Sequence, residues 1–402
     1  MTQVIQTILA GQVWTPKHCL LNHVITIADG KIADLAQASS ERPLASAGVL
    51  DASDGIVIPG LVDLQVNGAL GWGFQATNRD HFDDIVAFHL AAGTTTLLPT
   101  LVTAGEETLL DSLSALAEFL NGSSLATLPG IHLEGPFLSP ERRGAHDESA
   151  LLKPDIELAR RFVEAAEGHL RMVTLAPELP GAIPVIECFA QGGAIVSAGH
   201  TNAALDDMRR AMASGLSFVT HAGNASDWPH RALGELGFLA SEPGVVGALL
   251  AEPTLSGSVI LDGYHFHPSL LSPLLHLKGP ERLILVSDAS SVVGCPPGDY
   301  DGDGLRVTIH PQGFATSGRG GGWLAGSVIT LLQAVQRAVR LAGILPQEAV
   351  TMASLGPARL LGIESRKGQL RVGSDADLVV VNADLSLRHV IAGGHLIPRG
   401  DM

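Results

Sequence analysis

Carboxylate and histidine side chains stand directly after several short apolar runs of this sequence. They are Glu134 in GIHLEG, His200 in GAIVSAGH, His221 in LSFVTHAG and Asp288 in RLILVSDA. So regular a placement is hard to attribute to solvated loops. Glu134, His200 and His221 make a set of three protein ligands that leaves a fourth position for water, as a catalytic zinc site requires. Asp288 has the chemistry to take a proton from that water and return it to a leaving group.

Two of these residues also have a structural interpretation. A buried Glu134 could pair with the guanidinium of Arg142 or Arg143, and Asp288 could cap the turn that follows it. A single buried histidine is more often a hydrogen-bonded core residue than a ligand, and for His267, in GSVILDGYHFH, both interpretations stay open. The metal interpretation is favoured for the two histidines that a small or polar loop follows.

The stretch PGLVDLQVNG carries two neutral amides, Gln65 and Asn67. They lie on one face of a predicted strand, because side chains two residues apart point the same way. A strand end with two polar groups on one face often carries a ligand. Amides, however, are poor metal ligands and poor proton shuttles, so the residues alone leave the task of this pair open.

Short apolar runs alternate with amphipathic stretches from about residue 56 to 360, and this alternation predicts the elements that position the polar side chains. Near-continuous apolar runs suit strands that helices cover on both faces. The predicted strands include TTLLPT, GIHLEG, RMVTLAP, GAIVSAGH, LSFVTHAG, VVGALLAE, GSVILDGYH and RLILVSDA. Predicted helices are DDIVAFHLAAG, ELARRFVEAAEG and ALDDMRRAMASG, each of which ends in Gly, and GSVITLLQAVQRAV, which Ser327 could cap. Repeated strand–helix units over roughly 250–300 residues favour an α/β fold of the (β/α)8 barrel type, in which reactive side chains lie at the carboxyl ends of the strands.

The two ends of the chain carry a different pattern. Residues 1–55 and 368–402 alternate apolar and polar residues and are rich in turns, as in HVITIADGKIADL and GQLRVGSDADLVVV. We therefore expect β-strands from both termini to pair into a small second domain. The expected bounds are 1–58 and 363–402 for the two parts of this β-domain and 59–362 for the barrel.

The composition argues against several classes of partner. With 25 Lys and Arg against 41 Asp and Glu, the formal net charge is -16, and a diffuse acidic surface disfavours nucleic acid and anionic membranes. Cys19, Cys188 and Cys295 are far apart and form no CxxC motif, which indicates buried or free thiols in a reducing compartment rather than a disulfide framework. No signal peptide and no run of about 20 apolar residues is recognised. We expect a cytoplasmic protein.

Several motifs together resemble the N-acetylglucosamine-6-phosphate deacetylase family of the amidohydrolase superfamily. They are PGLVDLQVNG, HLEGPFLSPERRGAH, SAGHTNA, DGYHFHP, LVSDA, LAGS and GQLRVGSDADLVVV, in the expected order along nearly the whole chain. The resemblance implies a metal-dependent (β/α)8 barrel with a small β-sandwich domain built from both termini, assembled as a homodimer. The implied reaction converts N-acetyl-D-glucosamine 6-phosphate to D-glucosamine 6-phosphate and acetate.

The resemblance also implies roles for individual residues. Glu134, His200 and His221 match the metal ligands, and Asp288 matches the catalytic acid and base. His265 matches a residue that contacts the substrate and helps to polarise the acetyl carbonyl. The implied cofactor is one divalent ion per subunit, Zn2+ in the first place and Fe2+, Co2+ or Mn2+ as alternatives. Positions that bind sugar or phosphate are matched by His146, Asn224, Ala225 and Arg231, the last of which could reach across a dimer interface.

Gln65 and Asn67 stand where many amidohydrolases have His-x-His, which holds a second metal. With amides in place of imidazoles, this remnant of a second-metal subsite should bind metal weakly or hold a water. One tight catalytic metal is therefore expected. The alternative is that the amides hydrogen-bond to loop backbone, and both statements can hold.

Two departures from the family pattern bear on the substrate. After His221 the family has a bulkier pair where this chain has Ala222 and Gly223, which could widen the pocket or shift the sugar preference. The segment ASDWPHRALGE also differs, so that His230 is an alternative to Arg231 as the phosphate contact, and Arg231 could be an ordinary surface residue. Deacetylation of N-acetylgalactosamine 6-phosphate or another N-acyl amino sugar is therefore an alternative activity. A catalytically inactive barrel used for binding is a third hypothesis, which the intact metal and acid–base set disfavours.

Overall fold

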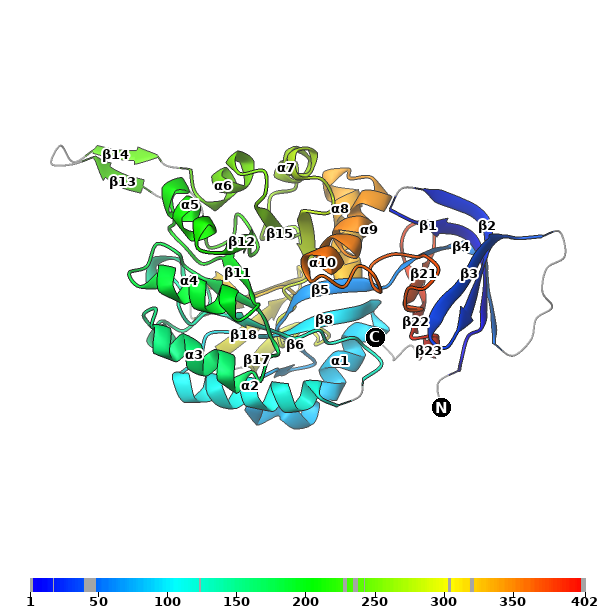
Figure 1. Ribbon diagram of the computed structural model, residues 1–402, viewed down its shortest axis with the longest axis horizontal. Helices are drawn as coiled ribbons and strands as arrows, with labels where there is room; N and C mark the ends of the chain where they lie inside the picture. Colours follow the sequence, from blue (N-terminus) through cyan, green and yellow to red (C-terminus); the bar gives the residue numbers. More distant parts are fainter. Residues whose placement is uncertain are drawn as a thin grey trace.

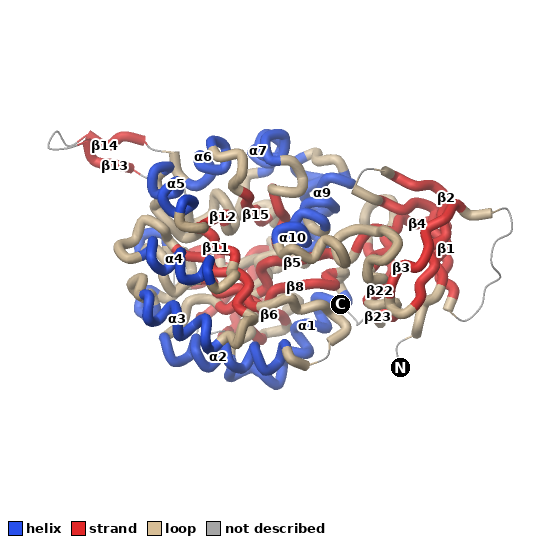
Figure 2. Tube along the Cα trace, viewed as in Figure 1, coloured by secondary structure: helices blue, strands red, loops and turns tan. Residues whose placement is uncertain are grey.

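The computed structural model describes residues 3–16, 18–39, 48–122, 124–226, 230–233, 238–241, 243–302, 305–318 and 322–398, without the side chains of residues 230–233, 238–241, 302 and 305. Figure 1 shows two parts: a large body of strands and helices, and a smaller β-sheet to which both ends of the chain contribute. In Figure 2 the helices surround the strands of the larger body.

Eight parallel strands form the centre of the larger body. They lie in the order β16-β15-β12-β11-β10-β9-β8-β5. A bridge joins Val66 of β5 to Ala289, three residues after the end of β16, so that the sheet is a nearly closed barrel. The strands are β5 Leu61–Val66, β8 Thr94–Leu101, β9 Ile131–Glu134, β10 Leu170–Leu175, β11 Ile195–Ala198, β12 Leu216–Val219, β15 Ser256–Ile260 and β16 Leu283–Val286.

A helix follows each barrel strand along the chain, which is the expected pattern of a (β/α)8 barrel. The predicted helices are present, but α8 begins later than predicted. Thr330 caps it in a capping box with Gln333, whereas the hydroxyl of Ser327 donates to the backbone oxygen of Ser287. The helices are α1 Phe82–Ala91, α2 Glu106–Leu120, α3 Ile156–Ala165, α4 Ala182–Gln191, α5 Leu205–Ala213, α6 Val245–Ala251, α7 Leu271–Lys278 and α8 Leu331–Ala342, followed by α9 Pro346–Met352 and α10 Leu355–Leu360.

One predicted strand is wrong. The run VVGALLAE forms helix α6. Its buried residues, Val245, Ala248 and Leu249, have the spacing of one helix face. A short apolar run does not by itself distinguish a buried strand from a buried helix, and here the helix packs outside the barrel.

The barrel interior is apolar at the end where the strands begin. Leu64, Met172 and Phe218 pack there with Ala358 and Leu361, which lie in or directly after α10. Helix α10 therefore closes this end of the barrel. The carboxyl ends of the strands lie at the opposite end, which is where polar side chains were predicted.

Seven strands from the two ends of the chain form the second sheet, in the order β23-β22-β21-β4-β1-β2-β3. Strand β21 pairs antiparallel with β4, so that both ends share one sheet. Buried Lys367 binds Asp375 and Asp377 just before β21, and Lys31 of β3 also reaches Asp375. The predicted fold class, a barrel with a small β-domain from both termini, is confirmed. The strands are β1 Thr7–Trp14, β2 Cys19–Ala28, β3 Lys31–Gln37, β4 Val49–Pro59, β21 Leu378–Val381, β22 Leu387–Ala392 and β23 His395–Ile397.

Short extra strands follow three of the barrel strands. After β16, an antiparallel sheet is formed by β17 Gly298–Gly302, β18 Leu305–His310, β19 Phe314–Ser317 and β20 Trp323–Leu324. After β5 there is a small pair, β6 Gly68–Ala69 and β7 Trp72–Gly73. After β12, the hairpin of β13 His230–Leu233 and β14 Phe238–Ser241 projects away from the barrel in Figure 1.

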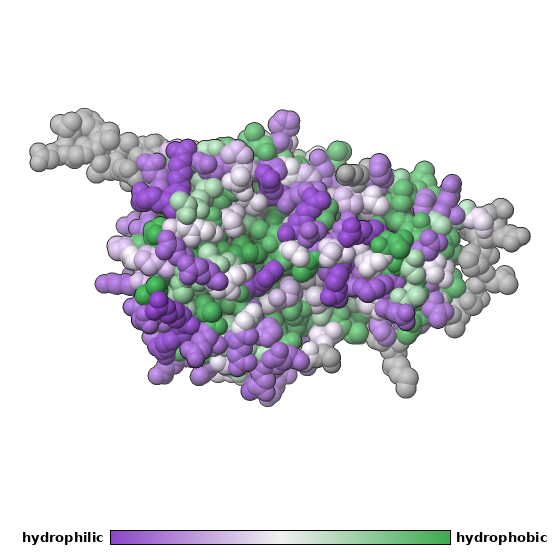
Figure 3. Space-filling model, in the orientation of Figure 1, coloured by the Kyte–Doolittle hydropathy of each residue, from purple (hydrophilic) through white to green (hydrophobic). Residues whose placement is uncertain are grey.

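Part of the surface is strongly hydrophilic (Figure 3). On the face drawn in Figure 3, hydrophilic side chains gather over α2 and α3. Within the described part of the chain, every helix is too short or too polar to cross a membrane.

Candidate active site

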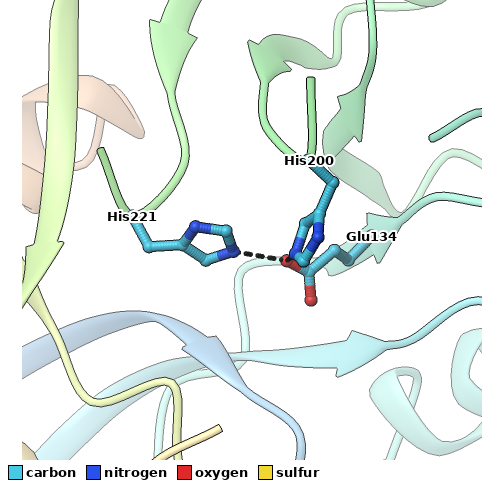
Figure 4. Close-up of side chains that lie close together, drawn as sticks. All are labelled: Glu134, His200 and His221. Atoms are coloured by element: carbon cyan, nitrogen blue, oxygen red, sulfur yellow. Dashed lines mark hydrogen bonds and ion pairs between the residues drawn. The ribbon is translucent and has the colours of Figure 1, made fainter. Parts of the chain in front are cut away.

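Glu134, His200 and His221 meet at the carboxyl ends of three barrel strands. Glu134 is the last residue of β9, and the two histidines follow β11 and β12. Oε1 of Glu134 lies 2.9 Å from Nε2 of His221 and 3.5 Å from Nε2 of His200 (Figure 4). One ligand atom of each residue lies within 4.8 Å of the others, and all three side chains are buried. The structure thus brings together the three residues that were predicted to share a site.

The backbone at this end of the barrel is strained. His200, His221 and Asp288 have φ angles of +47°, +30° and +47°. Residues other than glycine rarely adopt this left-handed region. Such conformations cost about 1–3 kcal/mol each and persist where the surrounding structure imposes them, often at functional sites. The strain is therefore an independent sign of function at these three residues.

The ring of His200 is held in one orientation from behind. Its Nδ1 lies 3.0 Å from the backbone oxygen of Arg142, so that Nδ1 donates and Nε2 is directed toward Glu134. A metal-binding histidine is usually oriented by such a bond. In contrast, Nδ1 of His221 has no hydrogen-bond partner among the described residues.

Neither neighbouring arginine pairs with Glu134 in the described structure. The guanidinium of Arg142 bonds to the side chain of Asn202, and that of Arg143 lies 3.3 Å from Glu148. The structural alternative considered for Glu134 is therefore not observed, and its carboxylate faces the two histidines instead.

Electrostatics favour a charged carboxylate in this cluster. Burial opposes ionisation of Glu134, but hydrogen bonds from His200 and His221 hold its pKa well below the ordinary value. Burial favours a neutral His221 ring, but the hydrogen bond and charge of Glu134 raise the pKa of that ring. A buried carboxylate and two imidazoles provide ligand atoms for a metal ion, and the negative charge of the carboxylate attracts a cation.

The two amides of β5 donate hydrogen bonds to carboxylates on other strands. Nε2 of Gln65 donates to Oε1 of Glu134 at 3.0 Å, and Nδ2 of Asn67 donates to Oδ1 of Asp288 at 2.8 Å. The register between β5 and β8 shifts in the second half of β5, and such bulges re-aim the side chains that follow. The side chains therefore contact the site rather than loop backbone.

Asp288 lies two residues after β16 and is buried beside the cluster. Burial and the charge of Glu134 raise its pKa to about 6, against the opposing effects of His221, His265 and Asn67. A carboxyl group with a pKa near neutrality is suited to accept and return a proton. Among the described residues its carboxylate receives one hydrogen bond, from Asn67, so that no turn cap is observed.

His265 and Asp262 form a hydrogen-bonded pair in the loop after β15. Nδ1 of His265 lies 2.6 Å from Oδ2 of Asp262, whose Oδ1 accepts the backbone N–H groups of Tyr264 and His265, each at 2.9 Å. Burial opposes ionisation of Asp262, but the hydrogen bond from His265 lowers its pKa. Asp262 was not predicted, although it stands three residues before His265 in the motif DGYH.

Some of the other residues considered for substrate contact line the cavity, and others do not. His146 and Asn224 line the cavity, and burial lowers the pKa of His146 to about 3. Ala225 does not line it, but its left-handed backbone, with φ of +45°, shapes the loop. Arg231 belongs to β13, and its side chain lies outside the described residues.

His267 is exposed, and its Nδ1 accepts the backbone N–H at the start of the 3-10 helix η5 (Pro268–Leu270), which supports the structural interpretation.

The cavity has walls that were not predicted from the sequence. Val307 of β18 and Leu324 of β20 add apolar surface to the lining. The alternating run LRVTIH and the motif LAGS were the available signals. No Lys or Arg is among the described residues of the lining. The lining is Asn67, Val102, Glu134, Gly144, Ala145, His146, His200, His221, Asn224, His265, Asp288, Ser290, Ser291, Val307, Leu324, Ala325 and Gly326.

Comparison with known proteins decides the family. The Amidohydrolase family matches residues 56–397. N-acetylglucosamine-6-phosphate deacetylase from Lysinibacillus sphaericus is 31% identical over 378 residues, which are 92% of each chain. A solved structure from Mycobacterium smegmatis is also similar: a variant of N-acetyl-D-glucosamine-6-phosphate deacetylase in complex with N-acetyl-D-glucosamine-6-phosphate. Its TM-score is 0.86 and its sequence identity is 34%, and the match covers 98% of this chain and 99% of that one. This chain belongs to the N-acetylglucosamine-6-phosphate deacetylase family of amidohydrolases. The predicted family is confirmed.

The relatives of this amidohydrolase do not all carry the name of one sugar. N-acetylgalactosamine-6-phosphate deacetylase from Escherichia coli O157:H7 is 32% identical over 397 residues, which are 98% of this chain and 99% of that one. Relatives named for two epimeric sugars are thus equally similar. Family membership alone does not choose between the epimers.

The buried cluster fits a divalent metal ion. One carboxylate and two imidazoles are ligands that Zn2+ takes in catalytic sites, where three protein ligands leave an open position. Glu134 is held in its charged form, and His200 is already oriented by its Nδ1 bond. The cluster is therefore compatible with a divalent metal site.

Proposed function

We propose that this protein hydrolyses the N-acetyl group of N-acetyl-D-glucosamine 6-phosphate to give D-glucosamine 6-phosphate and acetate. The observation that carries the proposal is the buried set of Glu134, His200 and His221 with Asp288 beside it, in a cavity at the carboxyl ends of the barrel strands. Relatives named for this reaction are 31% and 34% identical over nearly the whole chain. A barrel used only for binding would not need this set.

In this proposal Glu134, His200 and His221 hold one divalent ion, with Zn2+ preferred and Fe2+, Co2+ or Mn2+ as alternatives. When bound, the ion supplies Lewis acidity, which polarises a carbonyl oxygen and lowers the pKa of water. The backbone oxygen of Arg142 accepts from Nδ1 and orients the His200 ring so that Nε2 would be the atom that binds the ion. Glu134 supplies the negative charge of the ligand set.

Asp288 is the proposed proton carrier. It accepts a proton from the water that attacks the acetamide carbonyl carbon, and then gives this proton to the amine nitrogen as the C–N bond breaks. An amine is a poor leaving group until it is protonated, so the second transfer is as necessary as the first. A pKa of about 6 suits both transfers near neutral pH.

His265 is proposed to stabilise the negative charge that develops on the carbonyl oxygen. Its ring lines the cavity while Nδ1 donates to Asp262. The other ring nitrogen, Nε2, is then the atom that would face the carbonyl oxygen of the substrate. Donors aimed at a developing oxyanion are among the largest contributions to acyl-transfer catalysis.

Sugar and phosphate contacts are proposed for His146, Asn224, Ala225 and Arg231. His146 and Asn224 line the cavity. Because the described lining contains no Lys or Arg, the phosphate needs a cation from elsewhere. Arg231 stands on the hairpin that projects from the barrel in Figure 1, which favours a reach into a second copy of the chain in a homodimer.

Domain bounds, a compartment and partners are also proposed for the whole protein. The domain bounds are 1–58, 59–362 and 363–402. The three cysteines are free, as expected of a protein in the reducing cytoplasm. The acidic charge and the small-molecule cavity favour an amino sugar phosphate as partner over nucleic acid or membranes.

A second candidate substrate is N-acetylgalactosamine 6-phosphate. The relative from Escherichia coli O157:H7 favours it, as does the loop after His221, where buried Ala222 and left-handed Gly223 replace bulkier residues of the family. Turnover of both N-acetyl hexosamines, each with and without the 6-phosphate, tests the proposal in metal-replete protein. We expect the highest kcat/KM for the gluco 6-phosphate. A higher value for the galacto epimer would favour the second candidate, and no turnover of any of the four would refute both.

A further inference from the structure

Two side-chain amides contact the two carboxylates of the proposed site, yet the proposed chemistry does not use them directly. Gln65 and Asn67 are only 1% and 8% exposed. Their NH2 groups lie 3.0 Å from Glu134 and 2.8 Å from Asp288. An ionised carboxylate can only accept hydrogen bonds, so both amides act as donors.

The orientation of the Asn67 amide is set by Asp288. Its Oδ1 is buried and has no hydrogen-bond partner among the described residues. Turning the amide over would place that oxygen against the Asp288 carboxylate, which is a repulsive arrangement. Asn67 thus leaves its own acceptor unsatisfied while it donates to Asp288, and within the described chain no other side chain or backbone group donates to that carboxylate.

The strand end that carries the amides is tied to the strand end that carries Asp288. The backbone N–H of Ser287 donates to Asp63 at 3.2 Å, and its hydroxyl donates to the backbone oxygen of Gln65 at 3.3 Å. The backbone N–H of Asn67 donates to Ala289 at 2.9 Å. These hydrogen bonds link the end of β5 to the segment that follows β16, where the barrel closes. The backbone that carries the two amides is therefore bonded directly to the backbone that carries Asp288.

We propose that Gln65 and Asn67 are positioning residues with separate tasks. Gln65 orients Glu134 as a metal ligand, and Asn67 orients Asp288 for proton transfer. The inference rests on the proposed function and deepens it, because it gives the pair a task that does not depend on a second metal. Groups that orient the ligands of a metal commonly change metal affinity or activity about 10- to 100-fold when they are replaced.

Gln65→Leu and Asn67→Leu test the two tasks, since each removes an NH2 donor while keeping a side chain of similar size. Thr94→Val is the matched control, because Thr94 is buried, its hydroxyl has no described partner, and it begins β8 at the far end of the barrel. Each protein is loaded with Co2+. Its absorption spectrum during competition with a chelator gives the metal affinity, and kcat and KM are measured at saturating metal. Should a leucine variant fail to fold, Gln65→Met and Asn67→Ala repeat the test.

The two variants should fail in different ways. Gln65→Leu should bind Co2+ about 10- to 100-fold more weakly and recover most of its kcat at saturating metal. Asn67→Leu should bind Co2+ like the unchanged protein but lose about 10- to 100-fold in kcat with little change in KM. The control should match the unchanged protein in both measurements.

Three results would overturn the inference: equal losses of metal affinity and kcat in both variants, similar losses in the Thr94 control, or no loss in either variant. If the unchanged protein turns over none of the four sugars, the proposed function fails on its own. The difference in Co2+ affinity between the Gln65 and Asn67 variants still decides the inference in that case, because it is measured without substrate.

Discussion

Replacing Asp262 by Asn tests whether the charge behind His265 contributes to catalysis. The carboxylate uses one oxygen for the backbone N–H groups of Tyr264 and His265 and the other for the His265 ring. Asparagine keeps one oxygen and adds an NH2 group. We expect the oxygen to stay with the two backbone donors, so that the NH2 group faces Nδ1 of His265. The ring must then accept at Nδ1 and carry its proton on Nε2.

The variant therefore replaces the ionised partner behind the His265 ring by a neutral amide. Hydrogen bonds with an ionised partner contribute about 1.5–3 kcal/mol, and neutral ones about 0.5–1.5 kcal/mol. The difference of about 1–1.5 kcal/mol predicts a fall in kcat of about 10-fold, if the bond strengthens as charge develops on the carbonyl oxygen. KM and metal content should change little, because Asp262 does not line the cavity.

Steady-state kinetics of Asp262→Asn, His265→Ala and the double variant provide the assay. If Asp262 acts through His265, the Asn change should have no further effect once the ring is removed. A full 10-fold fall in the His265→Ala background would refute this reasoning, as would an unchanged kcat in the single variant.

Two further predictions concern stability. Burial opposes ionisation of Asp375, but Arg366 and neighbouring lysines lower its pKa to about 2. Its ionised form should therefore contribute about 1–2 kcal/mol to the free energy of unfolding above pH 4, and this contribution should be lost as the pH falls toward 2. Urea unfolding at pH 6 and pH 3 should show a smaller acid loss for Asp375→Asn than for the unchanged protein, and equal losses would contradict this. Thr174→Val removes the hydroxyl that lies 2.8 Å from Nε2 of His132 and 2.7 Å from the hydroxyl of Thr220 inside the barrel. It should lower the free energy of unfolding by about 1–3 kcal/mol, and unchanged thermal unfolding would show that this network is not stabilising.

The sequence predicted most of the barrel because its strands are buried on both faces and its helices end in glycine. The cluster of one carboxylate and two histidines was predictable for a related reason. In a parallel barrel all carboxyl ends lie at one edge, so that polar residues such as Glu134, His200 and His221, each placed after an apolar run, must lie near one another.

Other features depend on geometry that the sequence pattern does not encode. The partners of Gln65 and Asn67 follow from a bulge in β5 and from the closure of the barrel against β16. The left-handed backbone at His221 and Asp288 could not be expected, because these are not glycines. The length of VVGALLAE suits either a strand or a helix, and only its packing outside the barrel makes it a helix.

The role of Asp288 is tested most directly by Asp288→Asn. The asparagine keeps the shape of the side chain and an oxygen for Asn67, but it lacks the charge that accepts a proton. Metal content by elemental analysis and turnover of N-acetyl-D-glucosamine 6-phosphate are measured on the same sample. We predict about one divalent ion per chain, as in the unchanged protein, and a kcat lower by about 10²- to 10⁴-fold. A variant that keeps its metal and deacetylates at the unchanged rate would contradict the proposed mechanism.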